Sequence, residues 1–151
     1  MSQLEKDIKT LNYPEYLVVL NQVTNKLIIF EEVFSEYVHT AKDIIKGKAL
    51  VGESLPLLQK YFSQNLQSLK QFANIIIAIP VESNCLELRE NLNNAFQQYI
   101  LSTKNLYTVI NQDNLEDYQA IIECRQAQRS QVLNISKILV SSSKITHDSA
   151  I

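Results

Sequence analysis

Residues 13–46, YPEYLVVLNQVTNKLIIFEEVFSEYVHTAKDIIK, decide the fold, because their apolar and aromatic positions recur in alternating steps of three and four without a break. Pro14 suits the first turn of a helix, where its missing N–H costs nothing, and Gly47 suits the position just past a helix end. The spacing therefore predicts one long helix over about residues 14–46. Its seam consists of Tyr13, Tyr16, Leu20, Val23, Leu27, Phe30, Phe34, Tyr37, Ala41 and Ile44.

Three more long helices are predicted after this one. The segment GKALVGES, residues 47–54, holds both glycines and is expected to be a loop, and Ser54 just before Pro56 marks the start of a second helix that Pro80 ends. A third helix is expected over about residues 84–111 and a fourth over about residues 113–142. Each of these two ranges opens on Asn or Asp with Glu three residues later, which is the pattern of a capping box.

Length and composition favour a single all-α domain. A chain of 151 residues with 46% hydrophobic content, two glycines and three prolines has too few turn residues for a β-sandwich or barrel. Because the connections are short, we predict an antiparallel up-down-up-down four-helix bundle over residues 1–142. Leu4, Ile8 and Leu11 lie at helical spacing and predict a short N-terminal extra helix, whereas residues 143–151 lack periodicity and are expected to form a flexible C-terminal tail.

The most apolar stretch of the chain lies at the end of the second predicted helix. The isoleucines of this run cover every direction around a helix, so this end is expected to be buried all round. Residues 1–12 or the apolar part of the 47–54 loop are candidate covers, and a second copy of the chain or another protein is the alternative. The candidate partner-binding residues are therefore Ile75, Ile76, Ile77, Ile79 and Val81.

One irregularity interrupts the apolar stripe of the fourth helix. Polar Gln128 occupies a stripe position, with Arg125 and Arg129 beside it, and Tyr99, Ser102 and Thr103 are expected at a comparable level of the third helix. The residues predict a polar layer across the middle of the bundle. One interpretation is structural, with the arginines in solvent or paired with Glu31, Glu32 or Glu36. The other is a pocket for a small anion or polar ligand, with Tyr99, Arg125, Gln128 and Arg129 as ligand-binding residues.

Several chemistries lack their usual residues. Glu36 and His39 form the only Glu-x-x-His pair, and His39 is expected on the surface, so no metal site is predicted. Cys85 and Cys124 fall at different levels of the predicted bundle, too far apart for a disulfide, and neither has a histidine partner for nucleophilic catalysis. With two glycines there is no phosphate-binding loop. We therefore predict no catalytic residues and no cofactor.

Charge and the ends of the chain bear on partners. The net charge is −2 and the basic residues are scattered, which makes nucleic acid an unsuitable partner. The charged N-terminus does not resemble a secretory signal, and no run of about 20 apolar residues is present, so a cytoplasmic protein without a membrane span is expected.

These observations favour a non-enzymatic interaction module that forms a homo-oligomer or binds another protein. The alternative is a small-molecule-binding, sensor-like bundle organised around the polar layer. A third hypothesis is a chaperone or adaptor that holds the amphipathic helix of a partner in a groove. Architecture by itself does not choose among them.

Overall fold

The fold consists of four long helices joined by short connections, as the all-α prediction requires. The structure is a computed structural model that describes the backbone of residues 9–149 and the side chains of residues 9–142. The elements are α2 (Tyr13–Ile45), α3 (Leu55–Ala78), the short 3-10 helix η1 (Ser83–Cys85), α4 (Leu86–Ile110) and α5 (Tyr118–Ser149).

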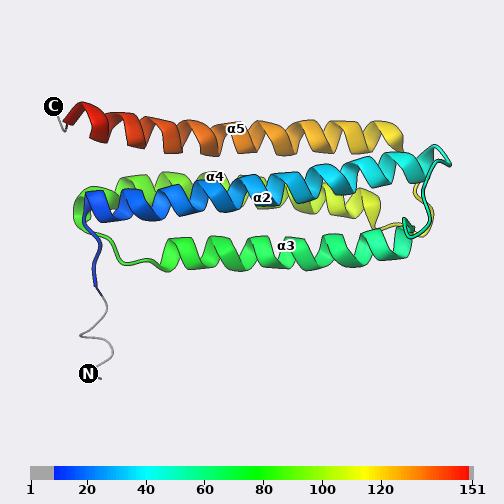
Figure 1. The fold of residues 1–151 in the computed structure, drawn as a ribbon, viewed down its shortest axis with the longest axis horizontal. Helices are drawn as coiled ribbons and strands as arrows, with labels where there is room; N and C mark the ends of the chain where they lie inside the picture. The colour runs from blue at the N-terminus through cyan, green and yellow to red at the C-terminus, as the bar shows by residue number, and fades with distance from the viewer. Residues whose placement is uncertain (1–8, 150–151) are drawn as a thin grey trace, which may run out of the picture.

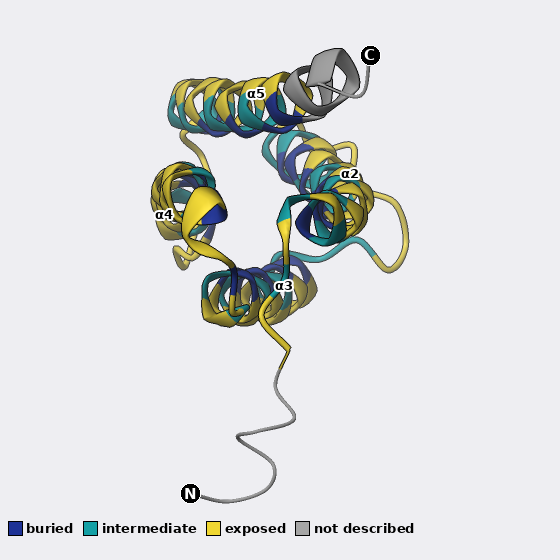
Figure 2. Cartoon of the chain, turned by 90° about the vertical axis from the view of Figure 1, so that its left-hand side faces the viewer, coloured by how far each residue is buried: buried dark blue, intermediate teal, exposed yellow. Residues whose placement is uncertain are grey.

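The helices lie side by side, and each of the four packs against two others. Figure 2, which looks along the helices, shows α5 and α3 on opposite sides with α4 and α2 between them. α4 contacts α3 and α5, and α2 contacts the same two helices. In Figure 1 the chain reverses direction from each long helix to the next, so the 47–54 loop and the link between α3 and α4 lie at opposite ends.

The two ends of α2 follow the signals in the sequence. The side chain of Asn12 accepts a hydrogen bond from the backbone of Glu15, and the Glu15 carboxylate accepts one from the backbone N–H of Asn12. This reciprocal pair satisfies donors that a helix start leaves unpaired. At the other end Gly47 has φ 69°, a left-handed conformation that glycine adopts without a steric cost. The predicted bounds of this helix are therefore within one residue of the observed ones.

Seven of the ten predicted seam residues of α2 are buried in the core, and Tyr13, Tyr37 and Ile44 are only partly buried. Tyr16, Phe34 and Ala41 are completely buried, whereas Val38 and not Tyr37 fills the position between the last two. Tyr37 lies partly buried beside this position, where its hydroxyl accepts a hydrogen bond from Asn65 of α3 at 2.7 Å. Its polar end therefore stays near the surface while its ring packs on the core.

The last two helices begin at other residues than predicted. η1 precedes α4, and neither element has a side-chain cap, so the capping box expected at Asn84 does not form. α5 starts at Tyr118, where Asp117 caps the helix by accepting a hydrogen bond from the N–H of Ala120 at 3.0 Å. Leu115 explains the later start, because it is buried at 4% exposure in the link before the helix.

The end of α5 also differs from the prediction. The helix continues to Ser149, past the predicted end at residue 142. The flexibility expected for residues 143–151 is a separate property and stays a prediction.

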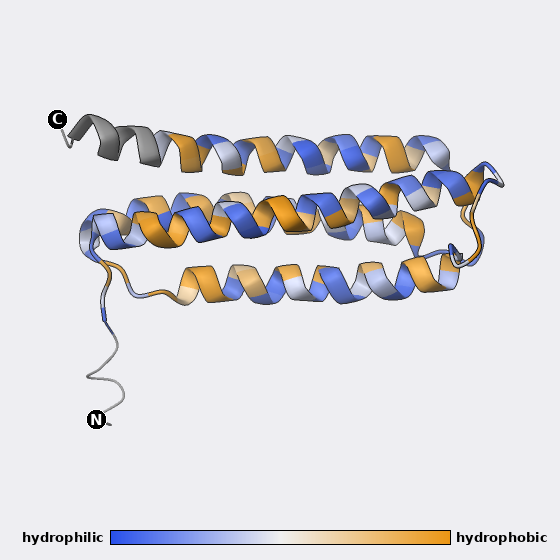
Figure 3. Ribbon diagram, viewed as in Figure 1, coloured by the Kyte–Doolittle hydropathy of each residue, from blue (hydrophilic) through white to orange (hydrophobic). Residues whose placement is uncertain are grey.

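The isoleucine run at the end of α3 is not buried all round, contrary to expectation. Ile76 and Val81 are buried and Ile79 packs partly buried against the core, but Ile75 is 63% exposed. Figure 3 shows the apolar character of this end of α3. The helix stops at Ala78, so the residues beyond it no longer share its faces.

Leu11 covers part of this end, where it is partly buried and pairs with Val81 in a parallel bridge. The N–H of Leu11 donates to the carbonyl of Pro80 at 2.9 Å, and the N–H of Glu82 donates to the carbonyl of Leu11 at 2.9 Å. The predicted N-terminal helix is wrong at Leu11, while Leu4 and Ile8 lie outside the described residues. The 47–54 loop lies at the far end of the helices and is excluded as the cover (Figure 1).

Candidate functional site

A polar layer crosses the middle of the structure, as Gln128 predicted. Gln128 is completely buried on α5, and its amide nitrogen donates to the hydroxyl of Thr103 on α4 at 2.9 Å. The Thr103 hydroxyl donates in turn to the backbone carbonyl of Tyr99 at 2.8 Å. Ser102 donates to the same carbonyl, so it bonds within its own helix and not across the layer.

The charged part of the layer is an ion pair between α2 and α5. Arg125 meets the carboxylate of Glu31 through both terminal nitrogens, at 3.1 and 3.0 Å. The same guanidinium donates to the side-chain oxygen of Gln128 at 2.6 Å. With side chains only 14% and 19% exposed, Arg125 and Glu31 form a forked, hydrogen-bonded pair, the geometry that compensates best for lost hydration.

Tyr99 completes the layer from α4. Its hydroxyl donates to the Glu31 carboxylate at 2.7 Å, while its ring is completely buried. Burial raises the pKa of this hydroxyl, and the negative charge of Glu31 acts in the same direction. Tyr99 is therefore a neutral hydrogen-bond donor, and the buried polar atoms of the layer have partners. We define the polar layer as Glu31, Tyr99, Thr103, Arg125 and Gln128.

Arg129, the fourth predicted ligand-binding residue, does not join this network. Its side chain is exposed and lines a pocket of about 400 Å³ together with Arg125, Lys42 and His39. This polar pocket lies between α2 and α5 and borders the layer, because Arg125 and Glu31 also line it. The structure thus brings Tyr99, Arg125 and Gln128 together by direct contacts and leaves Arg129 at the surface nearby.

A larger groove runs between α2 and α5 and continues into the polar pocket. It has a volume of about 1070 Å³. Its floor is formed by the apolar residues Leu27, Val132 and Leu139. Three large apolar side chains line its margins and stay more than half exposed, at 51%, 61% and 65%: Ile28, Leu133 and Val140.

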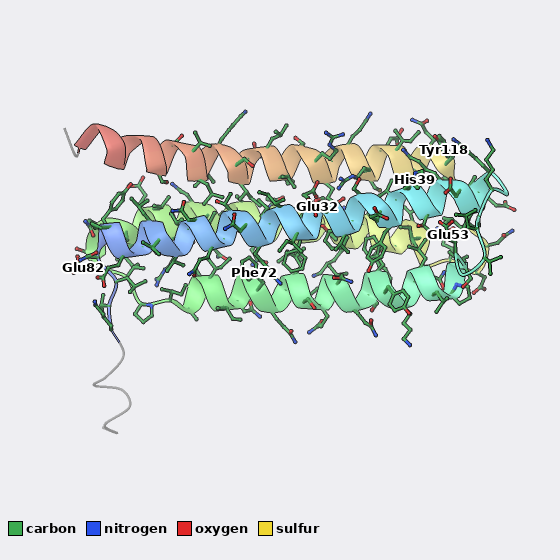
Figure 4. The ribbon with its side chains drawn as sticks, viewed as in Figure 1. Glu32, His39, Glu53, Phe72, Glu82 and Tyr118 are labelled. Atoms are coloured by element: carbon green, nitrogen blue, oxygen red, sulfur yellow. The ribbon has the colours of Figure 1, made fainter. Side chains whose placement is uncertain are left out.

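The walls of this α2–α5 groove also carry charges. Glu32 and Glu36 line it from α2, and Arg129 lines it from α5. Figure 4 shows Glu32 and His39 on the part of α2 that runs beside α5. His39 lies 3.4 Å from Asp43, one turn further along its own helix, and its exposed side chain agrees with the predicted surface position.

Neither cysteine has the surroundings of a reactive thiol. Cys85 is completely buried and Cys124 partly buried, and both are free thiols. Burial raises the pKa of each thiol, and nearby carboxylates act in the same direction. A raised pKa keeps a thiol in its weakly nucleophilic, protonated form.

The described residues contain neither a cluster of metal ligands nor a helix able to cross a membrane. Among the described side chains of residues 9–142, no three His, Cys, Asp or Glu residues gather as ligands for a metal ion. In the same part of the chain, no helix combines the length and the apolar character that a membrane crossing needs.

Comparison with known proteins adds no relationship: neither a protein-family profile, nor a curated protein, nor a solved structure matches this chain. The candidate sites therefore depend on the chemistry of their own residues. The groove is the site that the sequence did not indicate. The only signal for it was the surplus of apolar residues beside the seams, at Ile28 on α2 and at Leu133 and Val140 on α5.

Proposed function

We propose that this chain is an up-down-up-down helical bundle that acts as a non-enzymatic protein-interaction module, binding a helix of a partner protein in the α2–α5 groove. The reversal of chain direction between successive helices supports the topology (Figure 1). One observation carries the function: a groove of about 1070 Å³ with an apolar floor is bordered by apolar side chains that remain exposed. Contiguous exposed apolar surface of this kind is characteristic of interaction sites.

The walls of the groove favour a helix as its occupant. Both walls are α-helices, whose backbone groups are already paired, so an extended peptide finds no strand edge to extend. A helix satisfies its own backbone and places apolar side chains along one face. Adding a fifth helix between α2 and α5 covers Ile28, Leu133 and Val140 by the same packing that joins the other four helices.

The isoleucine run is a weaker candidate for partner binding than the groove. Of the predicted residues, Ile76 and Val81 are buried and Ile79 packs against the core. Ile77 is half-buried, which leaves Ile75 as the one exposed member of the set. A single exposed aliphatic side chain is common on protein surfaces and supports no interface by itself.

The test compares aspartate substitutions in the two regions. We expect a Leu133→Asp, Val140→Asp variant to stay folded, because both side chains are already exposed, and to lose binding of a synthetic amphipathic helix of about 18 residues with a leucine stripe and balanced charges. Ile75→Asp is the matched control and should bind as the unchanged protein does. Fluorescence anisotropy measures the binding, and circular dichroism the fold. Equal binding by all three proteins would contradict the groove as the docking site.

A small-molecule-binding function is the second candidate, and the polar pocket favours it. Arg125, Arg129 and Lys42 line this pocket, whereas Glu31 is the only carboxylate among its lining residues. A small dianion such as sulfate is the probe, and thermal unfolding is the measurement, because a ligand of the folded state raises its stability. A stabilisation that Arg129→Ala abolishes supports the pocket, and the absence of any stabilisation at millimolar sulfate contradicts it.

The compartment and the absence of catalysis belong to this proposal. A cytoplasmic location and the absence of nucleic-acid binding stay predictions from the sequence, the second from the net charge of −2 and the scattered basic residues.

A further inference from the structure

The two walls of the α2–α5 groove carry charges of opposite sign that no other described residue neutralises. Glu32 and Glu36 on α2 are exposed, and neither forms a hydrogen bond or ion pair with another described side chain. Arg129 on α5 is likewise without such a partner in the described chain. Glu31 differs, because Arg125 already pairs with its carboxylate. The free charges are therefore two carboxylates on one wall and one guanidinium on the other.

The spacing of the two carboxylates matches the surface of a helix. Glu32 and Glu36 are four residues apart on α2, so both lie on one side of the helix, about one turn from each other. A helix packed nearly parallel or antiparallel to α2 presents its own side chains at the same interval. Two basic residues four apart on that helix meet the two carboxylates together.

The length of the groove sets the length of its occupant. On α5 the lining residues extend from Arg129 to Val140, about 17 Å at 1.5 Å per residue, and on the longer wall, α2, they extend from Asn21 to His39, about 27 Å. A helix of about 18 residues spans this distance and turns about five side chains toward the floor. A small metabolite covers only part of such a length.

From these charges we infer that the partner helix is basic along the flank that faces α2: an amphipathic segment of about five turns, with Lys or Arg at two positions four residues apart beside its apolar stripe. This inference rests on the proposed function of the groove. A helix can enter a groove in either direction, and the direction decides which flank meets α2. The two carboxylates therefore fix the polarity of the bound helix as well as its charge.

A second copy of this chain fits the groove less well than another protein does. Two basic pairs of the described chain have the required spacing, Arg125 with Arg129 on α5 and Lys42 with Lys46 at the end of α2. Arg125 is committed to Glu31, and both lysines lie over the Tyr118 ring. The α5 helix of a second copy thus offers Arg129 alone to the two carboxylates. Self-association through this groove becomes an outcome of the test.

Two synthetic helices of about 18 residues test the inference. They share one leucine stripe and differ only at two flank positions four residues apart, which are Lys in the basic peptide and Glu in the acidic peptide. We expect the full chain to bind the basic peptide about threefold to tenfold more tightly at 0.15 M salt, as two rim ion pairs allow, and to lose most of this preference at 0.5 M salt.

A charge reversal in the protein locates the effect. Glu32→Lys, Glu36→Lys should prefer the acidic peptide, because all three free groove charges are then positive. The matched control is Glu87→Lys, Glu90→Lys, which makes the same change of net charge on exposed residues of α4 and should leave the preference unchanged. Fluorescence anisotropy gives the affinities, and light scattering gives the oligomeric state.

The outcomes separate the two proposals. Equal affinity for both peptides, unaffected by the Glu32 and Glu36 reversal but lost in Leu133→Asp, Val140→Asp, overturns the charge inference and leaves the groove as a docking site. Failure of both peptides to bind overturns the proposed function itself. A concentration-dependent dimer that Leu133→Asp, Val140→Asp dissociates identifies a second copy as the occupant and overturns the inference of a basic partner.

Discussion

The end of α3 and the α2–α5 groove are both rich in aliphatic side chains, but the chain covers them differently. At the end of α3, Ile76 and Val81 are buried, and Leu11 is held across Pro80 and Glu82 by two backbone hydrogen bonds. In the groove, Ile28, Leu133 and Val140 border an apolar floor and remain more than half exposed. The denser apolar run in the sequence is thus the better covered of the two regions.

This difference shows why apolar density in a sequence is a poor guide to an exposed surface. Exposure depends on how many elements surround a position and on how closely they approach. The end of α3 meets the segment before α2 and the start of α4, whereas an open groove lies between α2 and α5. A moderately apolar helix between widely spaced neighbours therefore exposes more apolar surface than a strongly apolar helix end.

The largest expected effect separates two neighbouring isoleucines at the end of α3. Ile76→Asp buries an unpaired charge at a site that is 3% exposed and should lower the free energy of unfolding by about 3–5 kcal/mol. Ile75→Asp, at a site 63% exposed, should change it by less than about 0.5 kcal/mol. Urea unfolding followed by circular dichroism measures both values, and similar losses in the two variants would refute the difference in burial.

A second comparison concerns two completely buried tyrosines, Tyr99 and Tyr16. The Tyr99 hydroxyl donates to the Glu31 carboxylate, so Tyr99→Phe should cost about 1.5–3 kcal/mol, the range for hydrogen bonds to charged groups. The Tyr16 hydroxyl has no hydrogen-bond partner among the described residues, and Tyr16→Phe should be nearly neutral at pH 7. The same unfolding measurement applies, and a larger loss for Tyr16→Phe would show that its hydroxyl is paired in solution.

The extended segment before α2 gives a third, somewhat smaller effect. Leu11→Pro removes the N–H that donates to Pro80, whereas Leu11→Ala shortens the side chain and keeps this donor. We expect the proline variant to be less stable than the alanine variant by about 1–2 kcal/mol. Equal stabilities of the two variants in urea would mean that side-chain packing alone attaches this segment.

The smallest effect concerns Tyr16 and the change in the free energy of unfolding as the pH becomes alkaline. Burial raises the pKa of Tyr16 from its usual 10.0 to about 12. A folded-state pKa above the unfolded one means that this contribution to stability is complete below about pH 10 and is lost as the pH rises toward 12. Urea midpoints from pH 8 to pH 11 should fall less steeply in Tyr16→Phe than in the unchanged protein. Identical slopes would contradict a raised pKa at this residue.

Local patterns predicted most of the fold. Heptad spacing and the flanking Pro14 and Gly47 placed α2 within one residue, because helix periodicity and capping are properties of neighbouring residues. Gln128 predicted the polar layer because a polar residue in an apolar stripe requires a partner. For the two arginines the sequence offered Glu31, Glu32 and Glu36 as partners, and the choice of Glu31 by Arg125 depends on how far α5 is shifted along α2.

The errors share a physical origin in contacts between distant segments. Asp113 and Asp117 are equally good caps by residue type, and the burial of Leu115 in the core favours the later one. Leu11 has helical spacing relative to Leu4 and Ile8, but its backbone pairs with Pro80 and Glu82, far away in the sequence. The width of the α2–α5 groove likewise could not be predicted from the apolar stripes. A stripe shows which face of a helix is buried, but not how far away the next helix lies.

The pairing of Leu11 with the residues after α3 also bears on how the chain folds during synthesis. Leu11 precedes α2 and leaves the ribosome early, whereas Pro80 and Glu82 follow only when α3 is complete. Synthesis proceeds from the N-terminus, and the two hydrogen bonds close a loop that contains both helices. This contact therefore becomes possible only when α2 and α3 are both available to pack. Hydrogen exchange of the Leu11 and Glu82 amides in nascent chains stalled at different lengths would show at which length the two helices have packed.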